Sequence, residues 1–294
     1  QNTFGTPVKS DSVAGVATEQ YRLNNISSNV SVFTFSKPVN SRTLEFEIVS
    51  TGIENGEVLE EAPLPGSQFS FLYRDNGQGP GSNTTGFFAQ FRQGTMQRGD
   101  FNIDSAVPNQ KVDIDAENIN QTDVWLYKLD SNGREGELWN KVDAVEGNNV
   151  VFNSLNKKIR SIYSVLTRSR DRVSLVFADG IFGDLPKGKF RSYYRTSSNS
   201  DYTILPPNMT NVTVRIPYLS NANKPETLTV TLDLKVAVNN AASTETIDSI
   251  KSNAPSTYYT QNRLITAEDY NVGPLGISQD IIKVKAVNRT ASGI

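Results

Sequence analysis

Three alternating carboxylates are the residues of this chain best arranged to do chemistry. Asp113, Asp115 and Glu117 lie two positions apart, so on a strand they would share one face, where a hard cation such as Ca²⁺ could bind. Apolar residues fill the positions between them from Val112 to Ala116, which is also the pattern of an amphipathic strand with one solvated side. We favour the amphipathic strand and expect no bound metal.

Two turn-rich stretches resemble ligand loops without meeting their requirements. No Gly-Lys-Ser/Thr sequence follows the glycine-rich run from Gly77 to Gly86, and a phosphate loop needs that lysine and hydroxyl. The stretch from Asp130 has Glu135 at the sixth position and Lys141 at the twelfth, where a calcium loop has glycine and glutamate. Both stretches are predicted to be surface turns.

The chain of 294 residues contains no cysteine and no histidine. This composition excludes disulfides, zinc-thiolate sites, histidine-bound metals and serine-histidine triads. An enzyme would depend on carboxylates, lysine or tyrosine alone, for example on two acids about 5–10 Å apart in the cleft of a glycosidase. The spacing singles out no such pair, so we expect neither an enzyme nor a cofactor.

The charge pattern argues against a nucleic-acid partner. The chain has 29 basic and 31 acidic residues, and neither sign forms a long block. The basic residues between Lys157 and Arg172 are interpreted as a solvated strand face. No apolar run reaches the ~20 residues of a membrane-spanning helix, so we also expect no membrane partner.

Alternation of apolar and polar residues predicts strands through most of the chain. We expect an extended N-terminal segment over residues 1–40, a β domain over 41–120 and a β-hairpin domain over 121–240. The expected fold class is mainly β, a β-rich α+β fold. It consists of several β-hairpins in two or more small β domains, with one or two short helices near the C-terminus.

Residues 241–294 are expected to form a helical linker and the start of a further domain. One helix is predicted over 243–252 with Ser243 as its N-cap, and another over 266–272, where Thr266 and Asp269 have capping-box spacing. An apolar strand pattern over 281–287 then runs close to the end of the chain. We therefore expect a fragment of a longer protein.

Residues 171–194 are predicted to form one rigid β-hairpin without a catalytic role. Val173, Leu175 and Phe177 recur with period two, separated by Ser174 and Val176, which we interpret as the pattern of a half-buried strand. Turn-forming residues follow them, namely Asp179, Gly180, Gly183, Pro186 and Gly188.

This stretch closely resembles a hairpin motif of the baseplate J-like family, which comprises structural proteins of contractile phage tails and related injection machines. Ala178 stands where that family usually has glycine. The residues that match the motif are Phe177, Asp179, Gly180, Gly183, Pro186 and Gly188.

Residues 243–270 resemble a helix and linker of the same family. Ala241-Ala242 stands where the family commonly has Gly-Gly. The matching segments are Ala254-Pro255, the run that ends at Arg263, and the run that contains Thr266, Asp269 and Tyr270. Residues 124–127 and 138–142 resemble the strand pair upstream of the hairpin, so the resemblance covers about residues 123–287.

The resemblance implies a baseplate wedge protein of contractile-tailed, T-even-like bacteriophages. Such a protein would be made in the host cytoplasm and become part of the virion, pairing with itself as a homodimer or ring and joining other wedge proteins. We expect Tyr258 and Tyr259 to contribute to subunit contact. The alternative, suggested by a β-rich sequence with many Asn, Thr and Tyr residues, is a carbohydrate- or receptor-binding tail module with exposed aromatic side chains in a groove.

Overall fold

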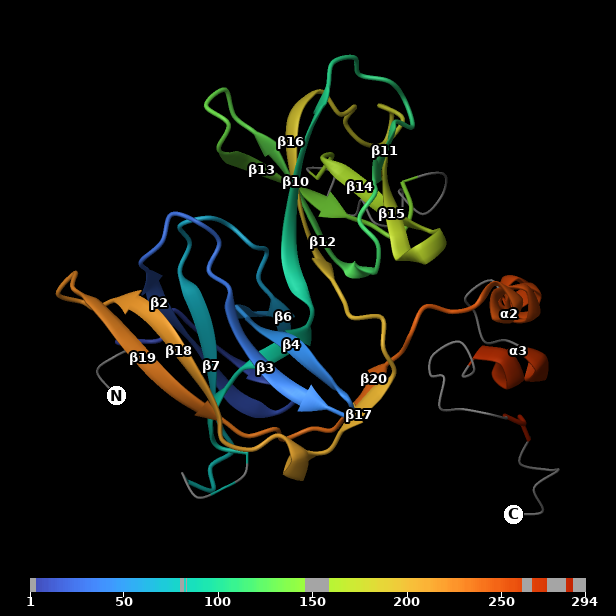
Figure 1. Ribbon diagram of the computed structural model, residues 1–294. Helices are drawn as coiled ribbons and strands as arrows, with labels where there is room; N and C mark the ends of the chain where they lie inside the picture. The colour runs from blue at the N-terminus through green and yellow to red at the C-terminus, as the bar shows by residue number, and fades with distance from the viewer. Residues whose placement is uncertain are drawn as a thin grey trace. The chain divides into compact units, whose positions relative to one another are not determined.

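The computed structural model describes residues 4–79, 82, 84–145, 159–260, 266–273 and 284–287. Strands make up most of the described chain, and two short α-helices lie near its C-terminal end (Figure 1). The expected mainly β fold class is therefore confirmed. The chain divides into a larger unit, 1–198 with 206–235, and a smaller unit, 199–205 with 236–294.

A seven-stranded sheet of the larger unit curls into a nearly closed barrel (Figure 1). Neighbouring strands are antiparallel except for one parallel pair. The strands, in spatial order, are β10 (Thr95–Ile103), β16 (Gly188–Thr196), β12 (Ile119–Leu129), β13 (Glu135–Lys141), β14 (Ile162–Arg168), β15 (Arg172–Phe177) and β11 (Lys111–Ile114). Its core is apolar and aromatic, with Leu126, Trp139, Phe177 and Phe190 all buried.

A second sheet of the larger unit combines strands from both ends of the sequence. Its spatial order is β19 (Pro225–Leu232), β18 (Val212–Leu219), β2 (Val16–Asn25), β7 (Phe69–Asp75) and β8 (Gly86–Phe88), and β1 (Lys9–Val13) also pairs with β2. Smaller sheets complete the unit. They consist of β3 (Phe33–Val39), β4 (Arg42–Val49) and β9 (Gln90–Gln93), and of β5 (Thr51–Glu54) with β6 (Glu57–Glu60).

The N-terminal segment is not merely extended, as we had expected for residues 1–40. It supplies β1, β2 and β3, and β2 pairs with β7 from Ala17 to Leu23. The buried positions of β2 include Thr18 and Gln20, which are polar. Because period-two analysis searches for alternating apolar residues, it could not detect this strand.

The expected domain boundary at residue 120 does not match the sheets, whereas the one expected at 240 lies close to residue 235, where the larger unit ends. Strands β10 and β11 precede residue 120 but belong to the same sheet as β12 to β16. The hairpin of β18 and β19 lies within the predicted hairpin domain, yet it joins the sheet that contains β2. Strand patterns identify the strands but not their partners, so a boundary drawn from them cut through a sheet.

The prediction of one hairpin over residues 171–194 was wrong. Strands β15 and β16 do occur there, but β15 pairs with β14 and β11, whereas β16 pairs with β10 and β12. Residues 178–187 therefore connect two strands that are not neighbours. The β12–β13 pair predicted upstream is confirmed, with Leu126 opposite Trp139.

The smaller unit contains a two-stranded sheet, β17 (Tyr202–Ile204) with β20 (Val238–Ala241), and the helices α2 (Ile247–Thr260) and α3 (Ala267–Val272). The Thr246 hydroxyl accepts a hydrogen bond from the Ser249 N–H in the first turn of α2, while the expected cap, Ser243, bonds to Asp201. Residues 284–287, the described part of the last predicted strand, form no strand. Within the described residues, no helix is long and apolar enough to cross a membrane.

Candidate functional site

The 178–187 connection contains most of the residues of the first motif. Phe177 enters it from the barrel core, where its ring lies 5.4 Å from that of Trp139 and 5.9 Å from that of Phe190. Asp179 Oδ1 accepts hydrogen bonds from the N–H groups of Ile181 at 2.8 Å and Phe182 at 3.2 Å. These bonds to the charged form lower the pKa of the Asp179 carboxyl.

The small residues of the connection are required by its backbone and by its packing. Gly180 has φ +89° and Gly188 has φ +102°, conformations that favour glycine. A Cβ on Gly183 would lie 2.6 Å from the Cβ of Ala178 and 2.7 Å from Ile162 Cγ1. Pro186 is buried.

Arg160 fastens the connection to the chain segment before β14. Its Nε lies 2.8 Å from Asp184 Oδ1, and its carbonyl accepts a hydrogen bond from the Asp184 N–H, also at 2.8 Å. Its terminal nitrogens donate to the carbonyl oxygens of Gly180 and Ile181, each at 3.3 Å. Each of these contacts holds the loop in position, which fits a structural role.

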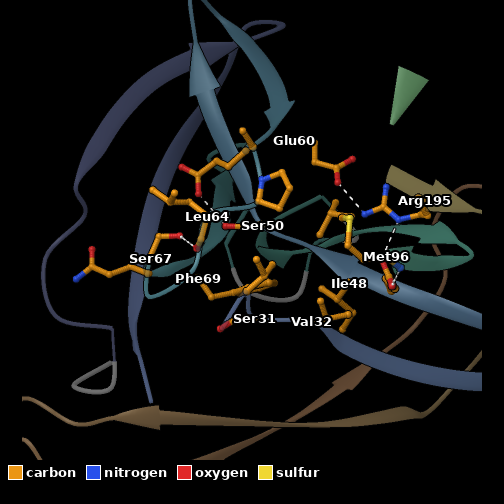
Figure 2. A pocket seen from close by; sticks show the side chains of 17 residues that line it. Ser31, Val32, Ile48, Ser50, Glu60, Leu64, Ser67, Phe69, Met96 and Arg195 are labelled. Carbon is orange, nitrogen blue, oxygen red and sulfur yellow. Dashed lines mark hydrogen bonds and ion pairs between the residues drawn. The ribbon is translucent and has the colours of Figure 1, made fainter. Parts of the chain in front are cut away.

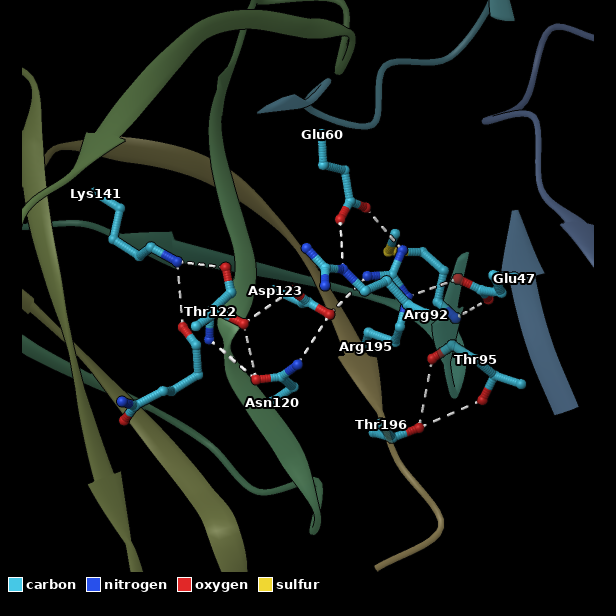
Figure 3. Close-up of polar contacts among 12 residues, drawn as sticks. Glu47, Glu60, Arg92, Thr95, Asn120, Thr122, Asp123, Lys141, Arg195 and Thr196 are labelled. Carbon is cyan, nitrogen blue, oxygen red and sulfur yellow. Dashed lines mark hydrogen bonds and ion pairs between the residues drawn. The ribbon is translucent and has the colours of Figure 1, made fainter. Parts of the chain in front are cut away.

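A buried arginine, Arg195 of β16, lies where three sheets meet, and its side chain is 2% exposed. Its guanidinium binds three carboxylates at once, as Figure 3 shows: Nε to Glu47 Oε2 at 2.8 Å, Nη2 to Glu60 Oε1 at 2.9 Å and Nη1 to Asp123 Oδ2 at 2.7 Å. The three acids come from β4, β6 and β12. We call these four residues the Arg195 cluster.

Further donors complete the Arg195 cluster. Asn120 Nδ2 donates to Asp123 Oδ2 at 3.1 Å, and the Met96 N–H donates to Glu47. Arg92 reaches Glu60 Oε2 at 3.3 Å from a half-exposed position. Burial alone would lower the pKa of the Arg195 guanidinium, but the surrounding carboxylates outweigh burial and raise it. The arginine is therefore permanently charged.

A small pocket of about 50 Å³ lies beside the cluster (Figure 2). Glu47, Glu60 and Glu61 line it, together with Arg195. Glu61 accepts hydrogen bonds from Gln20 Nε2 at 2.8 Å and Ser50 Oγ at 2.7 Å, and an ion pair links it to Arg22. A volume of this size holds a few water molecules rather than a sugar ring.

The three alternating acids at 113, 115 and 117 face arginines. Asp113 and Asp115 pair with Arg168 at 3.3 and 3.4 Å, and Glu117 pairs with Arg170 at 2.9 Å. The carboxylates thus meet the basic stretch that we interpreted as a solvated face. Within the described ranges, no group of three or more potential ligands is placed to hold a metal ion.

A second ionic group lies on β10, β13 and β16. Arg191 binds Asp100 through two hydrogen bonds of 2.7 and 2.6 Å and reaches Glu135 at 2.6 Å, and Tyr193 donates to the same Glu135 oxygen at 2.7 Å. The hydrogen bonds from Arg191 lower the pKa of Asp100. Burial would raise the pKa of Glu135, but its bonds from Arg191 and Tyr193 lower it. Burial, with Glu135 nearby, raises the pKa of Tyr127 to about 12.

The second motif is only partly described. The predicted capping box of α3 is confirmed, because Thr266 Oγ1 accepts from the Asp269 N–H at 3.2 Å and Asp269 Oδ2 accepts from the Thr266 N–H at 2.7 Å. Tyr270 is half exposed. Arg263 lies outside the described residues.

Tyr258 and Tyr259, the expected subunit contacts, belong to α2. Tyr258 is 78% exposed. The side chain of Tyr259 lies outside the described part of the chain.

The predicted turn at Asp130 is confirmed, and the predicted glycine-rich turn is described only in part. Asp75 Oδ1 accepts from the Gly77 N–H at 2.8 Å, which forms the described start of the glycine-rich turn. Asp130 Oδ1 accepts from the N–H groups of Asn132 at 2.8 Å and Arg134 at 2.9 Å.

The main feature that sequence analysis missed is the Arg195 cluster. One feature of the sequence could have indicated that Arg195 is buried: it lies two positions after Tyr193, so on a strand both side chains point to the same face, and Tyr193 is buried. Nothing in the local sequence identifies its partners, which lie up to 148 residues away.

The fold and these sites define a mainly β protein whose described ionic groups are engaged in structural contacts. The chain belongs to the family described as Domain of unknown function (DUF8360), whose model matches residues 1–237. No curated protein and no solved structure matches the chain. The matched region ends close to residue 235, where the larger unit ends.

Replacing Gly183 tests the packing of the connection. We expect Gly183→Ala to lower the free energy of unfolding by about 1–3 kcal/mol, because the new methyl group would overlap Ala178 and Ile162. Urea denaturation measures the change. Gly99→Ala is the control, since its Cβ would meet the Ser192 hydroxyl at 3.3 Å and Tyr194 Cε1 at 3.8 Å, neither of them as close as the contacts at Gly183. Equal losses in both variants would contradict the packing role of Gly183.

Removing Arg195 should destabilise the larger unit strongly. We expect Arg195→Met to lower the free energy of unfolding by about 3–5 kcal/mol, because buried carboxylates lose their counter-ion. Arg92→Met, which removes a half-exposed partner of Glu60, should cost less than about 1 kcal/mol. Urea denaturation of both variants measures the difference. A loss below about 1 kcal/mol for Arg195→Met would show that the cluster is not a major stabilising contact.

Acid should weaken the Arg191 group. The pKa values of Asp100 and Glu135 are lowered in the folded state, so their stabilisation is present above about pH 4 and is lost as the pH falls further, through the folded pKa values. We expect wild type to lose more unfolding free energy between pH 7 and pH 3 than the Asp100→Asn, Glu135→Gln double variant. Chemical denaturation at both pH values measures this. Parallel losses would mean that other carboxylates dominate the acid response.

Proposed function

We propose that the protein is a structural component of a phage tail baseplate wedge, which forms a ring through self-association and contacts with other wedge proteins. In this proposal it is made in the host cytoplasm, is located in the virion and catalyses no reaction. The observation that carries the proposal is the 178–187 connection, whose residues match a motif of the baseplate J-like family.

The packing of the connection supports this proposal. Gly183 has no room for a side chain, and Gly180 and Gly188 have positive φ angles. Phe177 anchors the entry of the loop in the barrel core. Backbone conformation and packing therefore explain the residue types at these motif positions without a catalytic role.

The use of charge supports a structural role as well. The carboxylates that line the pocket, Glu47, Glu60 and Glu61, all accept hydrogen bonds from arginine, amide or hydroxyl donors. General acid–base catalysis by two carboxylates requires a cleft wide enough for substrate between them. The pocket of about 50 Å³ is far smaller than a typical substrate site.

A carbohydrate- or receptor-binding tail module remains the second candidate. It is favoured by an aromatic cluster in which Phe87 is 49% exposed and stacks on Phe4 at 4.7 Å, with Tyr21 and Tyr73 packed edge-on against Phe87. Exposed aromatic rings are common contacts for sugars and proteins. Direct titration of the chain with purified bacterial lipopolysaccharide, with Phe87→Ala as the comparison, distinguishes this candidate.

Subunit contact through Tyr258 and Tyr259 is part of the main proposal. A Tyr258→Ala, Tyr259→Ala double variant that assembled like wild type would remove these two residues as contacts. Light scattering over a concentration series provides the comparison.

The location of the protein is the most direct test. An antibody raised against the chain should label the tail end distal to the head in particles purified from cultures that naturally express this gene. Electron microscopy of the labelled particles gives the position. Label on tail fibres together with lipopolysaccharide binding would favour the receptor-binding module, and absence of the protein from purified tails would refute both proposals.

A further inference from the structure

Strand β19 forms an open edge of its sheet. It is the terminal strand and pairs with β18 alone, through eight consecutive residue pairs from Val212–Leu232 to Leu219–Pro225 without a bulge (Figure 1). One side of its backbone therefore presents N–H and C=O groups that no strand of the described chain occupies. Such an edge is a template for another strand.

Other long edge strands in the described chain contain features that discourage pairing. Strand β10 has Arg98, Gly99 and Asp100 at its centre, and β3 has Lys37 and Pro38 near its end. Charges and prolines of this kind commonly protect sheet edges. The remaining edge strands of the described chain have five residues or fewer.

Strand β19 lacks this protection over most of its length. Its proline is the first residue, and its one charged side chain, Glu226, comes next and accepts a hydrogen bond from the Tyr218 hydroxyl at 2.7 Å. The following six residues are uncharged and alternate between threonine and aliphatic side chains. Four of the six are β-branched, which suits an extended strand.

The two faces of β19 differ in polarity. Thr227, Thr229 and Thr231 are exposed, whereas Leu228 and Val230 are half-buried and lie opposite the buried Ile216 and Val214 of β18. A partner strand must therefore match threonine on one face and aliphatic residues on the other. A shift of the pairing register by one residue would place threonine side chains opposite aliphatic ones.

We propose that β19 pairs with β19 of a second copy of the chain, antiparallel, about a two-fold axis at Thr229. In this register Thr229 lies opposite its own copy, Thr227 lies opposite Thr231, and Leu228 lies opposite Val230. Like side chains then share each face, and Glu226 lies opposite Leu232 rather than another acid. The second copy is favoured because β19 is complementary to itself.

This contact specifies one surface for the self-association that is part of the proposed function, and in that respect it rests on the proposed function. A two-fold interface is complete once two copies have joined, so it yields a pair and not a ring. A ring would need a second surface, for which the helix with Tyr258 and Tyr259 is our candidate. The two surfaces can be tested separately.

A single introduced cysteine tests the register. The chain has no cysteine, so Thr229→Cys provides its only thiol. Residues directly opposite in an antiparallel pair have Cβ atoms about 4.5–5.5 Å apart, close to disulfide distance. We expect mild oxidation to convert this variant into a disulfide-linked dimer, measured by non-reducing electrophoresis.

Thr213→Cys is the matched control. Thr213 is exposed on the same face of the hairpin but lies in β18, opposite Thr231. Across the proposed axis the two copies of Thr213 would be three strand spacings apart sideways, roughly 14 Å, and displaced along the strands as well, which is too far for a disulfide. Cross-linking at Thr213 that equals or exceeds cross-linking at Thr229 would overturn the proposal.

A lysine substitution tests the energy of the contact. Thr229→Lys places two like charges directly opposite each other, so we expect light scattering to show at least a tenfold (~1.4 kcal/mol) weaker dimer. Thr213→Lys should change dimerisation little, and circular dichroism checks that both variants fold. Wild type that stays monomeric at all concentrations, or Thr229→Lys that dimerises like wild type, would refute the contact.

The cross-linking experiments can succeed or fail independently of the antibody-labelling test of the proposed function. A cross-linked Thr229→Cys dimer without label on tails would sustain the β19 contact and reject the baseplate role. Label at the tail end without cross-linking of Thr229→Cys would support the baseplate role and reject the β19 contact.

Discussion

The larger unit depends on one buried guanidinium, that of Arg195. A buried charge costs several kcal/mol unless it is paired, and here the pairing requires acids from β4, β6 and β12 at the same time. Any rearrangement that separated these strands would leave charges buried without partners. The cluster therefore restricts where the barrel meets the smaller sheets, because a shift of any of these strands would break a buried ion pair.

Around this cluster, arginine side chains connect separate elements of the larger unit. Arg160 clamps the 178–187 connection, Arg168 and Arg170 engage the alternating acids, and Arg191 bridges Asp100 and Glu135. The apolar core of the barrel supplies buried apolar surface, and the arginines hold its loops and strand ends in one arrangement. Such a division suits a scaffold whose surfaces must stay at fixed separations.

Local patterns predicted local structure well. Strands β12 and β13 lie where residues 124–127 and 138–142 were predicted to form a strand pair, and the spacing of Thr266 and Asp269 identified the start of α3. Pairing was beyond those patterns, because a strand's period reveals its faces and not its neighbours. The buried polar residues of β2 concealed a strand, the supposed hairpin proved to be a crossing between non-adjacent strands, and Arg195 has partners far away in the sequence.

The pairing of β2 with β18 has a consequence for how the chain is made. Most of β2 pairs with β1 and β7, which are made early, and only its last two residues, Asn24 and Asn25, pair with β18. Asn24 pairs with Leu219, 195 residues later (219 − 24), so at about 5–20 residues per second this end of β2 waits roughly 10–40 seconds on the ribosome for its partner. A strand end exposed for that long invites aggregation if it is apolar, and two asparagines can stay in water instead.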